Sequence, residues 1–402
     1  MPITDLISVA EADALIDAHM PAFGVERVAM EAAVGRVLRE SIFAERDQPA
    51  FDRVMMDGIG IRWNDPSPRS FALAGTQMAG MARLTLSQPG ACLEVTTGAI
   101  VPEGCDCIIP VEQLRREGDR YVLPDDYRPA KGQFIHRQGS DCHAGTQVLE
   151  AGVRLGAPEM AQLAANGVPR VDVAMLPSIA VLATGDELVG VDAPLGEGQI
   201  RRSSDVAIVA LLRNHRFGRG ALSHAADDLD ATSDALRVLL ASHDVVVITG
   251  GVSMGQRDYV HEALAVLGVK RVFHRIAQRP GRPMWFGVGP ARQVVFALPG
   301  NPVSSLVCAV RYVRPALLAA MGLRRDAPEW VCLEEGVNAS ETLTCFAPVH
   351  VRQDPSGRSI AHPVPSPTSG DFSSLPRAHG VVQLPMAKDR APAGAVVPLY
   401  RW

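Results

Sequence analysis

Residues 244–258 read DVVVITGGVSMGQRD, an apolar β-branched run that ends in two glycines, a serine and then an acidic residue. This pattern is typical of a buried parallel strand that leads into a functional loop and a helix. Gly250 and Gly251 permit a sharp bend or the close approach of a ligand, and the amide groups that open the next helix favour an anion. Because ligands of open α/β sheets bind beyond the carboxyl ends of the strands, we expect the binding site at this loop.

The totals of the chain narrow the class of protein. Its 402 residues favour roughly two to four domains. The 39 basic and 44 acidic residues give a net charge of -5 without a basic block, so we expect no nucleic-acid partner. Acidic residues interrupt the N-terminal segment, which predicts neither a signal peptide nor a membrane span and therefore a cytoplasmic location.

The cysteines indicate a reducing compartment. Seven of them lie at irregular spacings, which is typical of reduced thiols rather than of a disulfide framework. Cys105 and Cys107 form a single C-x-C pair, which is weak evidence for a metal site. Buried structural cysteines are the simpler interpretation.

Strand and helix patterns predict four domains. A capping box at Ser8 and Glu11 starts a short helix, and helical spacing returns at residues 156–168. We therefore expect a discontinuous helical domain, 1–44 and 139–175, interrupted by a small β-rich domain, 45–138. Residues 176–327 alternate strands with helices, as in a doubly wound parallel sheet, and residues 328–402 predict a C-terminal β domain.

The predicted α/β domain brings carboxylates to one edge of its sheet. We expect strands at 178–184, 220–224, 244–249, 271–276 and 294–298, with helices at 204–215, 230–242, 257–267 and 302–320. The loops that follow the first three strands carry Glu187, Asp227 and Asp258. Like charges in one cleft repel one another unless a cation such as Mg²⁺, shared with a ligand's phosphate oxygens, neutralises them.

Two further strand ends favour an anionic ligand. The fourth strand ends in QRPGRP, residues 278–283, where Arg279 and Arg282 are suited to bidentate capture of a phosphate or another oxyanion. The fifth ends in LPGNP, residues 298–302, a tight turn that presents backbone amides. Together these loops predict chemistry that combines a metal with a phosphate or oxyanion.

Structural roles compete with these interpretations. Asp228 and Asp258 are placed to cap helices, as are Ser203 and Ser204. Arg279 could be a solvated surface charge, as could Arg282.

Three polar positions outside the α/β domain have no role that spacing alone can assign. Asp57 precedes a glycine and fits an Asp-Gly turn. Thr97 precedes Gly98, Asp141 follows Gly139 by two residues, and both fit turns.

The motifs resemble those of the molybdopterin molybdenumtransferases, the MoeA proteins and the related E domain of gephyrin, over nearly the whole chain. The most specific are MDG at 56–58, TGAIVPEG at 97–104, GSD at 139–141, TGDEL at 184–188, GQI at 198–200, TGGVS at 249–253, DY at 258–259 and LPGNP at 298–302. The resemblance implies four domains and a homodimer with its active site between subunits. The implied reaction inserts molybdate into adenylylated molybdopterin and releases AMP.

The resemblance also implies roles for single residues. Glu187, Asp227 and Asp258 would be carboxylates that bind metal and substrate. Asp57, Thr97 and Asp141 would approach from the other subunit. The implied substrate-binding residues are Thr97, Ser203, Ser204, Gly250, Gly251, Ser253, Arg279, Arg282, Pro299, Pro302 and Ser373.

The chain departs from the family pattern at several places. RVMMDGIG at 53–60 replaces a segment of the Asn-Ser-Ala-Met-Asp-Gly-Tyr-Ala type, and RSS at 202–204 replaces Asp-Ser-Asn. Arginines replace two lysines at 279 and 282, and Pro348 lies near the place of an expected arginine. Two other hypotheses therefore stand: a divergent paralogue that acts on another pyrophosphate-containing nucleotide or on tungstate, and a non-catalytic pterin-binding or scaffolding protein.

Overall fold

The computed structural model describes residues 6–65, 69–217, 220–252, 259–325, 327–366, 368 and 370–402. The chain forms two compact units. The large unit comprises Met1–Glu40, Ala151–Gly156 and Arg170–Trp402, and the small unit comprises Ser41–Glu150 and Ala157–Pro169.

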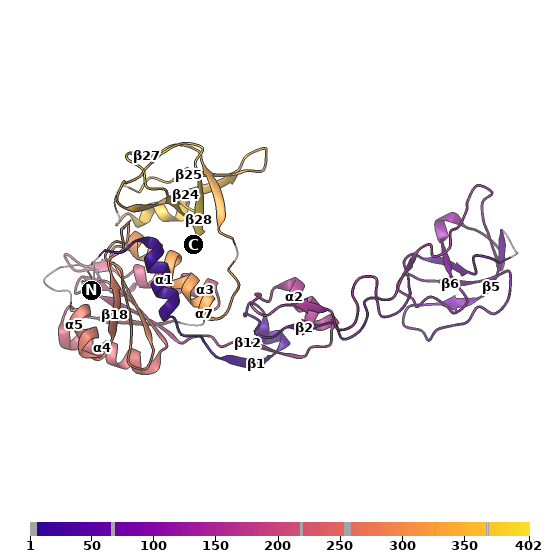
Figure 1. Cartoon of the computed structure of the whole chain (residues 1–402), viewed down its shortest axis with the longest axis horizontal. Helices are drawn as coiled ribbons and strands as arrows, with labels where there is room; N and C mark the ends of the chain where they lie inside the picture. The colour runs from indigo at the N-terminus through magenta and orange to yellow at the C-terminus, as the bar shows by residue number, and fades with distance from the viewer. Residues whose placement is uncertain are drawn as a thin grey trace. The chain divides into compact units, whose positions relative to one another are not determined.

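A six-stranded sheet forms the centre of the large unit (Figure 1). Its order is β16 (Ala221–Ala225), β13 (Ile179–Thr184), β17 (Val245–Thr249), β21 (Val294–Leu298), β20 (Trp285–Val288) and β18 (Lys270–His274). The first four strands are parallel, and β20 runs antiparallel to both of its neighbours. All strands except β20 therefore end at the same edge. The α/β prediction is confirmed, and β20 is the strand that the sequence analysis missed.

Alternating side chains bury both faces of this sheet. One face packs on α1 (Val9–His19), α3 (Ser204–Asn214) and a long helix formed by α6 (Pro302–Cys308), the π-helical η3 (Ala309–Val313) and α7 (Arg314–Ala320). The other face packs on α4 (Leu229–Ser242) and α5 (Val260–Val266). In β17, Val245 and Val247 face the first layer, whereas Val246 and Ile248 face the second. This two-sided burial explains why the strand reads as a continuous apolar run.

The long helix Pro302–Ala320 is also apolar enough to span a membrane by length and composition. However, its sequence window is 67% buried inside the protein. Val307, Val310 and Leu317 are fully buried in the core. Its apolar character is therefore that of a core helix.

Helix α1 packs on the α/β core, which differs from the helical domain predicted for 1–44 and 139–175. Ser8 and Glu11 form the expected capping box, and Ala12 and Ile16 are buried in the core cluster of the sheet. Asp13 forms an ion pair with Arg311 of η3 at 2.6 Å. The sequence gives the helix and its apolar face, but not the partner that covers this face almost 300 residues later.

The rest of the predicted helical domain consists of small sheets, one α-helix and one short 3-10 helix. In the large unit, β1 (Val25–Ala29) pairs with β12 (Arg170–Ala174), next to the short helix η1 (Met30–Ala33). In the small unit, β2 (Ile42–Phe43) pairs with β11 (Gln147–Leu149), and α2 (Ala157–Ala165) follows.

The C-terminal strands close into a small barrel, in line with the predicted β domain. Its strands follow the order β24 (Thr344–Gln353), β25 (Ser359–Pro363), β22 (Glu329–Leu333), β28 (Val396–Arg401) and β26 (Gly380–Leu384), and β26 pairs back onto β24. Closure leaves no free edge among these strands. Beside them lie β23 (Val337–Asn338), β27 (Arg390–Ala391) and η4 (Phe372–Arg377). The start of β24 also pairs with β19 (Gln278–Arg279), which joins the α/β domain to the barrel.

The small unit contains the predicted β-rich module. Its sheet has the order β7 (Cys107–Pro110), β4 (Gly58–Ile61), β6 (Ala91–Val95), β5 (Ser70–Gln77), β9 (Arg120–Val122) and β8 (Arg115–Glu117), with η2 (Val111–Gln113) after β7. β3 (Arg53–Val54) pairs with β10 (Ile135–His136), so the two ends of the module meet. This is the expected arrangement of an inserted module.

The cysteines are free thiols, as predicted. Burial raises the pKa of Cys92, Cys105, Cys107 and Cys308 to about 12. Thiols with such pKa values are inert at neutral pH.

Candidate functional site

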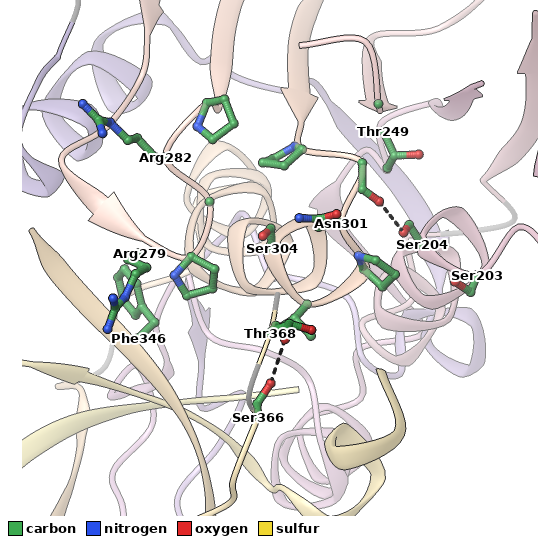
Figure 2. Close-up of a pocket in the computed structure, with 18 of the residues that line it drawn as sticks. Ser203, Ser204, Thr249, Arg279, Arg282, Asn301, Ser304, Phe346, Ser366 and Thr368 are labelled. Carbon is green, nitrogen blue, oxygen red and sulfur yellow. Dashed lines mark hydrogen bonds between the residues drawn. The ribbon is translucent and has the colours of Figure 1, made fainter. Parts of the chain in front are cut away.

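A cleft of about 1280 Å³ lies at the carboxyl edge of the α/β sheet, between this edge and the C-terminal barrel (Figure 2). It brings together most of the residues predicted from the α/β domain: Glu187, Ser203, Ser204, Asp227, Gly250, Gly251, Arg279, Arg282, Pro299 and Pro302. Ser253 and Asp258 lie outside the described residues.

The acidic side of the cleft carries Glu187 and Asp227. A Cβ atom at Gly185 would lie 2.5 Å from Glu187 Oε2, so the glycine allows the carboxylate to fold back over its own turn. Asp186 Oδ1 accepts a hydrogen bond from the Asp227 amide at 3.0 Å, which joins the two loops. The short pair β14 (Leu188–Val189) and β15 (Ile200–Arg201) continues the first loop. Both carboxylates are thus placed on one side of the cleft and remain accessible to a ligand.

The loop after β17, residues 249–252, presents main chain rather than side chains to the cleft. We call it the glycine loop. Gly250 and Gly251 have φ values of 95° and 62°, in the region that favours glycine. A Cβ atom at Gly250 would lie 2.6 Å from Thr184 O, and one at Gly300 would lie 3.5 Å from Gly250 Cα. The loops after β13, β17 and β21 therefore pack backbone against backbone.

Two buried oxygen atoms in the wall of the cleft have no hydrogen-bond partner among the described residues. They are Thr184 Oγ1 and Asp205 Oδ2, on residues that are 5% and 1% exposed. Asp205 Oδ2 lies 3.5 Å from Arg202 Nε, an ion pair without a hydrogen bond. An unpaired buried polar group costs about 1–3 kcal/mol, so such atoms in a cleft indicate where a ligand or water completes the bonding. The sequence analysis had assigned neither residue to the site.

The capping expectations have mixed outcomes. Asp228 caps α4, since its carboxylate accepts from the Ala231 amide at 2.9 Å, and this structural role is confirmed. Ser203 occupies the cap position of α3, but its hydroxyl makes no capping hydrogen bond. Ser204 Oγ instead donates to Gly300 O at 3.3 Å (Figure 2). Ser203 thus holds the expected cap position without a side-chain capping hydrogen bond, and Ser204 does not cap the helix.

The turn at residues 278–283, which we call the arginine turn, is supported from below by buried side chains. Gln278 is fully buried, accepts a hydrogen bond from the Tyr312 hydroxyl and donates to Pro280 O at 3.0 Å. Burial raises the pKa of Tyr312 well above its usual value, so the hydroxyl remains a donor. Gly281 has a φ of 94°, and a Cβ atom there would lie 2.5 Å from Cys308 Sγ. The helix α6–η3 thus fixes the turn.

Both arginines of this turn line the cleft. Figure 2 shows Arg279 and Arg282 on one side, with Ser203 and Thr249 on the other and Asn301 between them. The guanidinium groups are exposed, and they line the same cavity as the carboxylates. They are therefore available to an anion bound there. The sequence suggested the arginines but gave no sign of Gln278 and Tyr312, which hold them.

The C-terminal barrel contributes an uncharged wall. Its described lining residues are Val337, Asn338, Leu343, Cys345, Phe346, Ala347, Pro348, Pro363, Val364, Pro365, Ser366 and Thr368. Pro348, which lies near the place of the expected arginine, is part of this uncharged wall. Ser373 is exposed, donates to Asp371 Oδ1 at 2.6 Å, and is not among the described lining residues. Its predicted substrate contact stays a prediction.

The predicted residues of the small unit make local contacts. Asp57 Oδ1 accepts hydrogen bonds from the Thr97 amide at 2.6 Å and from its hydroxyl at 2.8 Å, which lowers the pKa of Asp57. Asp141 Oδ1 lies 2.7 Å from His136 Nε2. Asp57 and Thr97 therefore act as a pair, although 40 residues separate them in the sequence.

Three family models match successive parts of the chain. The MoeA N-terminal region (domain I and II) matches residues 7–167, the probable molybdopterin binding domain matches 180–319, and the MoeA C-terminal region (domain IV) matches 331–402. A molybdopterin molybdenumtransferase from Synechocystis sp. is 36% identical over 400 residues, which cover 99% of this chain and 100% of the relative. The chain belongs to the molybdopterin molybdenumtransferase family.

Other family members are similar to the chain over nearly its whole length. The molybdopterin molybdenumtransferase of Synechococcus elongatus is 34% identical over 397 residues, 94% of this chain and 95% of its own. The crystal structure of a molybdopterin biosynthesis MoeA protein from Pyrococcus horikoshii OT3 has a TM-score of 0.81 at 28% identity, and covers 99% of this chain and 100% of that one. The family predicted from the motifs is confirmed.

Proposed function

We propose that the protein is a molybdenumtransferase, which inserts molybdate into adenylylated molybdopterin and releases AMP. Membership of the family supports the transfer of molybdenum to molybdopterin. The observation that carries the proposal is a single cleft with carboxylates on one side and arginines on the other. Such a cleft suits a substrate that joins a pyrophosphate to a second oxyanion.

Each side of the cleft then has its own task. Arg279 and Arg282 hold molybdate or a phosphate, because guanidinium groups match the geometry of oxyanions. The glycine loop and the turn at 298–302 allow close approach of the phosphates to the main chain. Thr184 Oγ1 and Asp205 Oδ2, which lack hydrogen-bond partners among the described residues, would complete their bonding with the substrate or ordered water.

We further propose that Glu187 and Asp227 hold Mg²⁺ together with substrate oxygens. Within the described part of the chain, no three His, Cys, Asp or Glu side chains gather closely enough to hold a metal ion alone. Two carboxylates in one cleft nevertheless fit Mg²⁺, which proteins commonly bind through one or two carboxylates and substrate phosphates. Asp258 is the proposed third ligand. When bound, the ion would neutralise charge that develops at the pyrophosphate.

A second copy of the chain would complete the site. Asp57 is held by Thr97, and its carboxylate is exposed, so the pair is available to a neighbouring molecule. We propose that Asp57, Thr97 and Asp141 approach the cleft of the other subunit in a cytoplasmic homodimer.

The test is a complete reaction. The purified protein is incubated with adenylylated molybdopterin, molybdate and Mg²⁺, and AMP and active molybdenum cofactor are measured. Both should appear together, and omission of molybdate or chelation of the metal should suppress them. Absence of turnover with a folded protein would reject the proposal. Turnover only with tungstate, or with another pyrophosphate-containing nucleotide, would show a divergent enzyme instead.

A further inference from the structure

Four basic side chains of the large unit lie together at the C-terminal end of α3: Arg154, His215, Arg216 and Arg314. We call them the basic cluster. Arg154 Nη2 donates to His215 O at 3.3 Å, and Arg314 Nη1 donates to Arg401 O at 2.6 Å. The charge of Arg154 contributes to lowering the pKa of Arg314, and the charge of Arg216 does the same for Arg154, in both cases after the larger effect of burial. The cluster lies at the opposite end of α3 from Ser203 and Ser204, which line the cleft.

Arg154 and Arg314 differ from three other arginines of the chain that are largely removed from solvent. Arg36, Arg202 and Arg311 have side chains that are only 11%, 22% and 10% exposed, and each forms an ion pair with a carboxylate, Glu26, Asp205 and Asp13 respectively. Within the described residues, no carboxylate pairs with Arg154 or Arg314, which are half-buried, or with Arg216, which is exposed. Charges that are removed from water are normally paired, so Arg154 and Arg314 lack their counter-ion.

Hydrogen bonding is incomplete at the same place. Arg154 Nε and His215 Nδ1 are buried and have no partner in the part of the chain that the structure describes. Carbonyl groups at the end of a helix attract cations, which accounts for the bond from Arg154 to His215 O. That bond uses one of the five N–H donors of the guanidinium and leaves its charge uncompensated. Two unpaired polar atoms beside uncompensated cations indicate an anion.

We propose that the basic cluster binds a tetrahedral oxyanion that carries two negative charges, such as phosphate or molybdate. Arg154 and Arg314 supply most of the charge, and Arg154 Nε–H donates a hydrogen bond to the anion. His215 adds a second donor when its proton is on Nδ1. This site is separate from the cleft, and the proposal does not depend on the proposed function.

Anion-dependent thermal stability tests the proposal. Melting is followed in phosphate, in molybdate and in sodium chloride of equal ionic strength. The two oxyanion arms distinguish a phosphate site from a molybdate site. The native protein should melt about 3–5 °C higher in a saturating oxyanion than in chloride. The double variant Arg154→Gln/Arg314→Gln should lose most of this gain, whereas the matched cleft variant Arg279→Gln/Arg282→Gln should keep most of it. Equal melting in oxyanion and chloride, or an unchanged gain in the cluster variant, would overturn the proposal.

A second measurement keeps the proposal testable if the double variant does not fold. Crystals of the native protein soaked in molybdate should show an anomalous peak within hydrogen-bond distance of Arg154 Nε. A peak in the cleft without one at the basic cluster would contradict the site. A purely structural role, through the bonds to His215 O and Arg401 O, predicts that Arg314→Gln lowers the melting temperature equally in oxyanion and in chloride. That result would also overturn it.

Discussion

On the acidic side of the cleft, exposed or half-buried carboxylates stand on short loops that main-chain packing holds in place. On the other side, the arginine turn rests on a fully buried glutamine and a tyrosine from η3. Glu187 and Asp227 can be altered with little disturbance to the core, whereas the arginines depend on groups inside it. The two sides should therefore respond differently to substitution. Changes on the acidic side should lower the reaction rate, whereas changes on the arginine side should lower both stability and anion affinity.

The largest effect should follow from Glu187→Gln on the acidic side. Loss of the charge removes a proposed metal ligand, and we expect the rate of AMP release to fall about 100-fold or more. The fold should remain intact, because the side chain is exposed. Steady-state kinetics and circular dichroism measure the two properties. Asp230→Asn, an exposed acid in the first turn of α4, is the matched control and should retain activity.

A Glu187→Gln variant with an unchanged rate would remove the distinction between the two sides. If ligand binding without turnover were found in both the native protein and the variant, the non-catalytic interpretation would gain support instead.

The next largest effect should come from Gly250→Ala in the glycine loop. The new methyl group would lie 2.6 Å from Thr184 O, a backbone atom that cannot yield easily, and φ is 95°. We expect a loss of about 3 kcal/mol in the free energy of unfolding, together with weaker binding in the cleft. Urea denaturation measures the first quantity, and calorimetric titration with AMP measures the second.

Gly268→Ala is the control for the glycine loop. Its φ is 76°, and no heavy atom lies within 4 Å of the added methyl group. It should cost only about 1 kcal/mol and leave binding unchanged. Equal losses for the two variants would show that the packing of Gly250 against Thr184 contributes nothing.

The sequence predicted the acidic side better than the arginine side. Alternation within β17 and the glycines after it are local signals. The carboxyl ends of parallel strands meet at one edge of a sheet, and this general property brings Glu187 and Asp227 together. The support of the arginine turn is not local. Gln278 and Tyr312 are 34 residues apart, and Tyr312 lies in an apolar helix where an aromatic residue indicates only burial.

The same limit applies to the parts of the fold that the sequence analysis missed. Helix α1 was correctly expected from its capping box, but its packing partner lies in the α6–η3–α7 helix. β20 has four residues, one of them Gly287, and its strand signal is weak. Closure of the barrel depends on the pairing of β24 with β26, whose partners lie 31 (Val349 and Gly380) to 39 (Cys345 and Leu384) residues apart along the chain. Propensity and spacing describe segments, whereas these features depend on which segments meet.

On the arginine side, Tyr312→Phe should have a moderate effect. Removal of the hydroxyl leaves the buried Gln278 Oε1 without its donor, and we expect a loss of about 2 kcal/mol in the free energy of unfolding. Because Gln278 also donates to Pro280 O, the turn should loosen and the KM for molybdate should rise severalfold. Tyr400→Phe is the matched control, since its hydroxyl donates to Gln383 at 3.1 Å. It should lower stability without a change in KM, and a similar KM shift in both variants would contradict the specific support of the turn.

The smallest predicted effect is a loss of stability at acid pH through His274, which lies next to the end of the glycine loop. His274 is 9% exposed, and its Nε2 lies 3.3 Å from Val252 O. Burial, and then the charge of His261, lower the pKa of His274 from 6.5 to about 4. Between these pH values the unfolded chain binds this proton and the folded chain does not, so stability is lost as the pH falls from 6.5 towards 4.

For His274 alone, we expect a loss of about 1 kcal/mol at pH 5.5 relative to pH 7.5. Urea denaturation across this range, compared with His274→Gln, isolates the contribution because glutamine keeps a donor for Val252 O but does not titrate. The variant should show a shallower decline in stability with acid. If stability falls equally with acid in the native protein and in the variant, His274 is not held neutral beneath the glycine loop. Acid then destabilises the two sides of the cleft to the same extent.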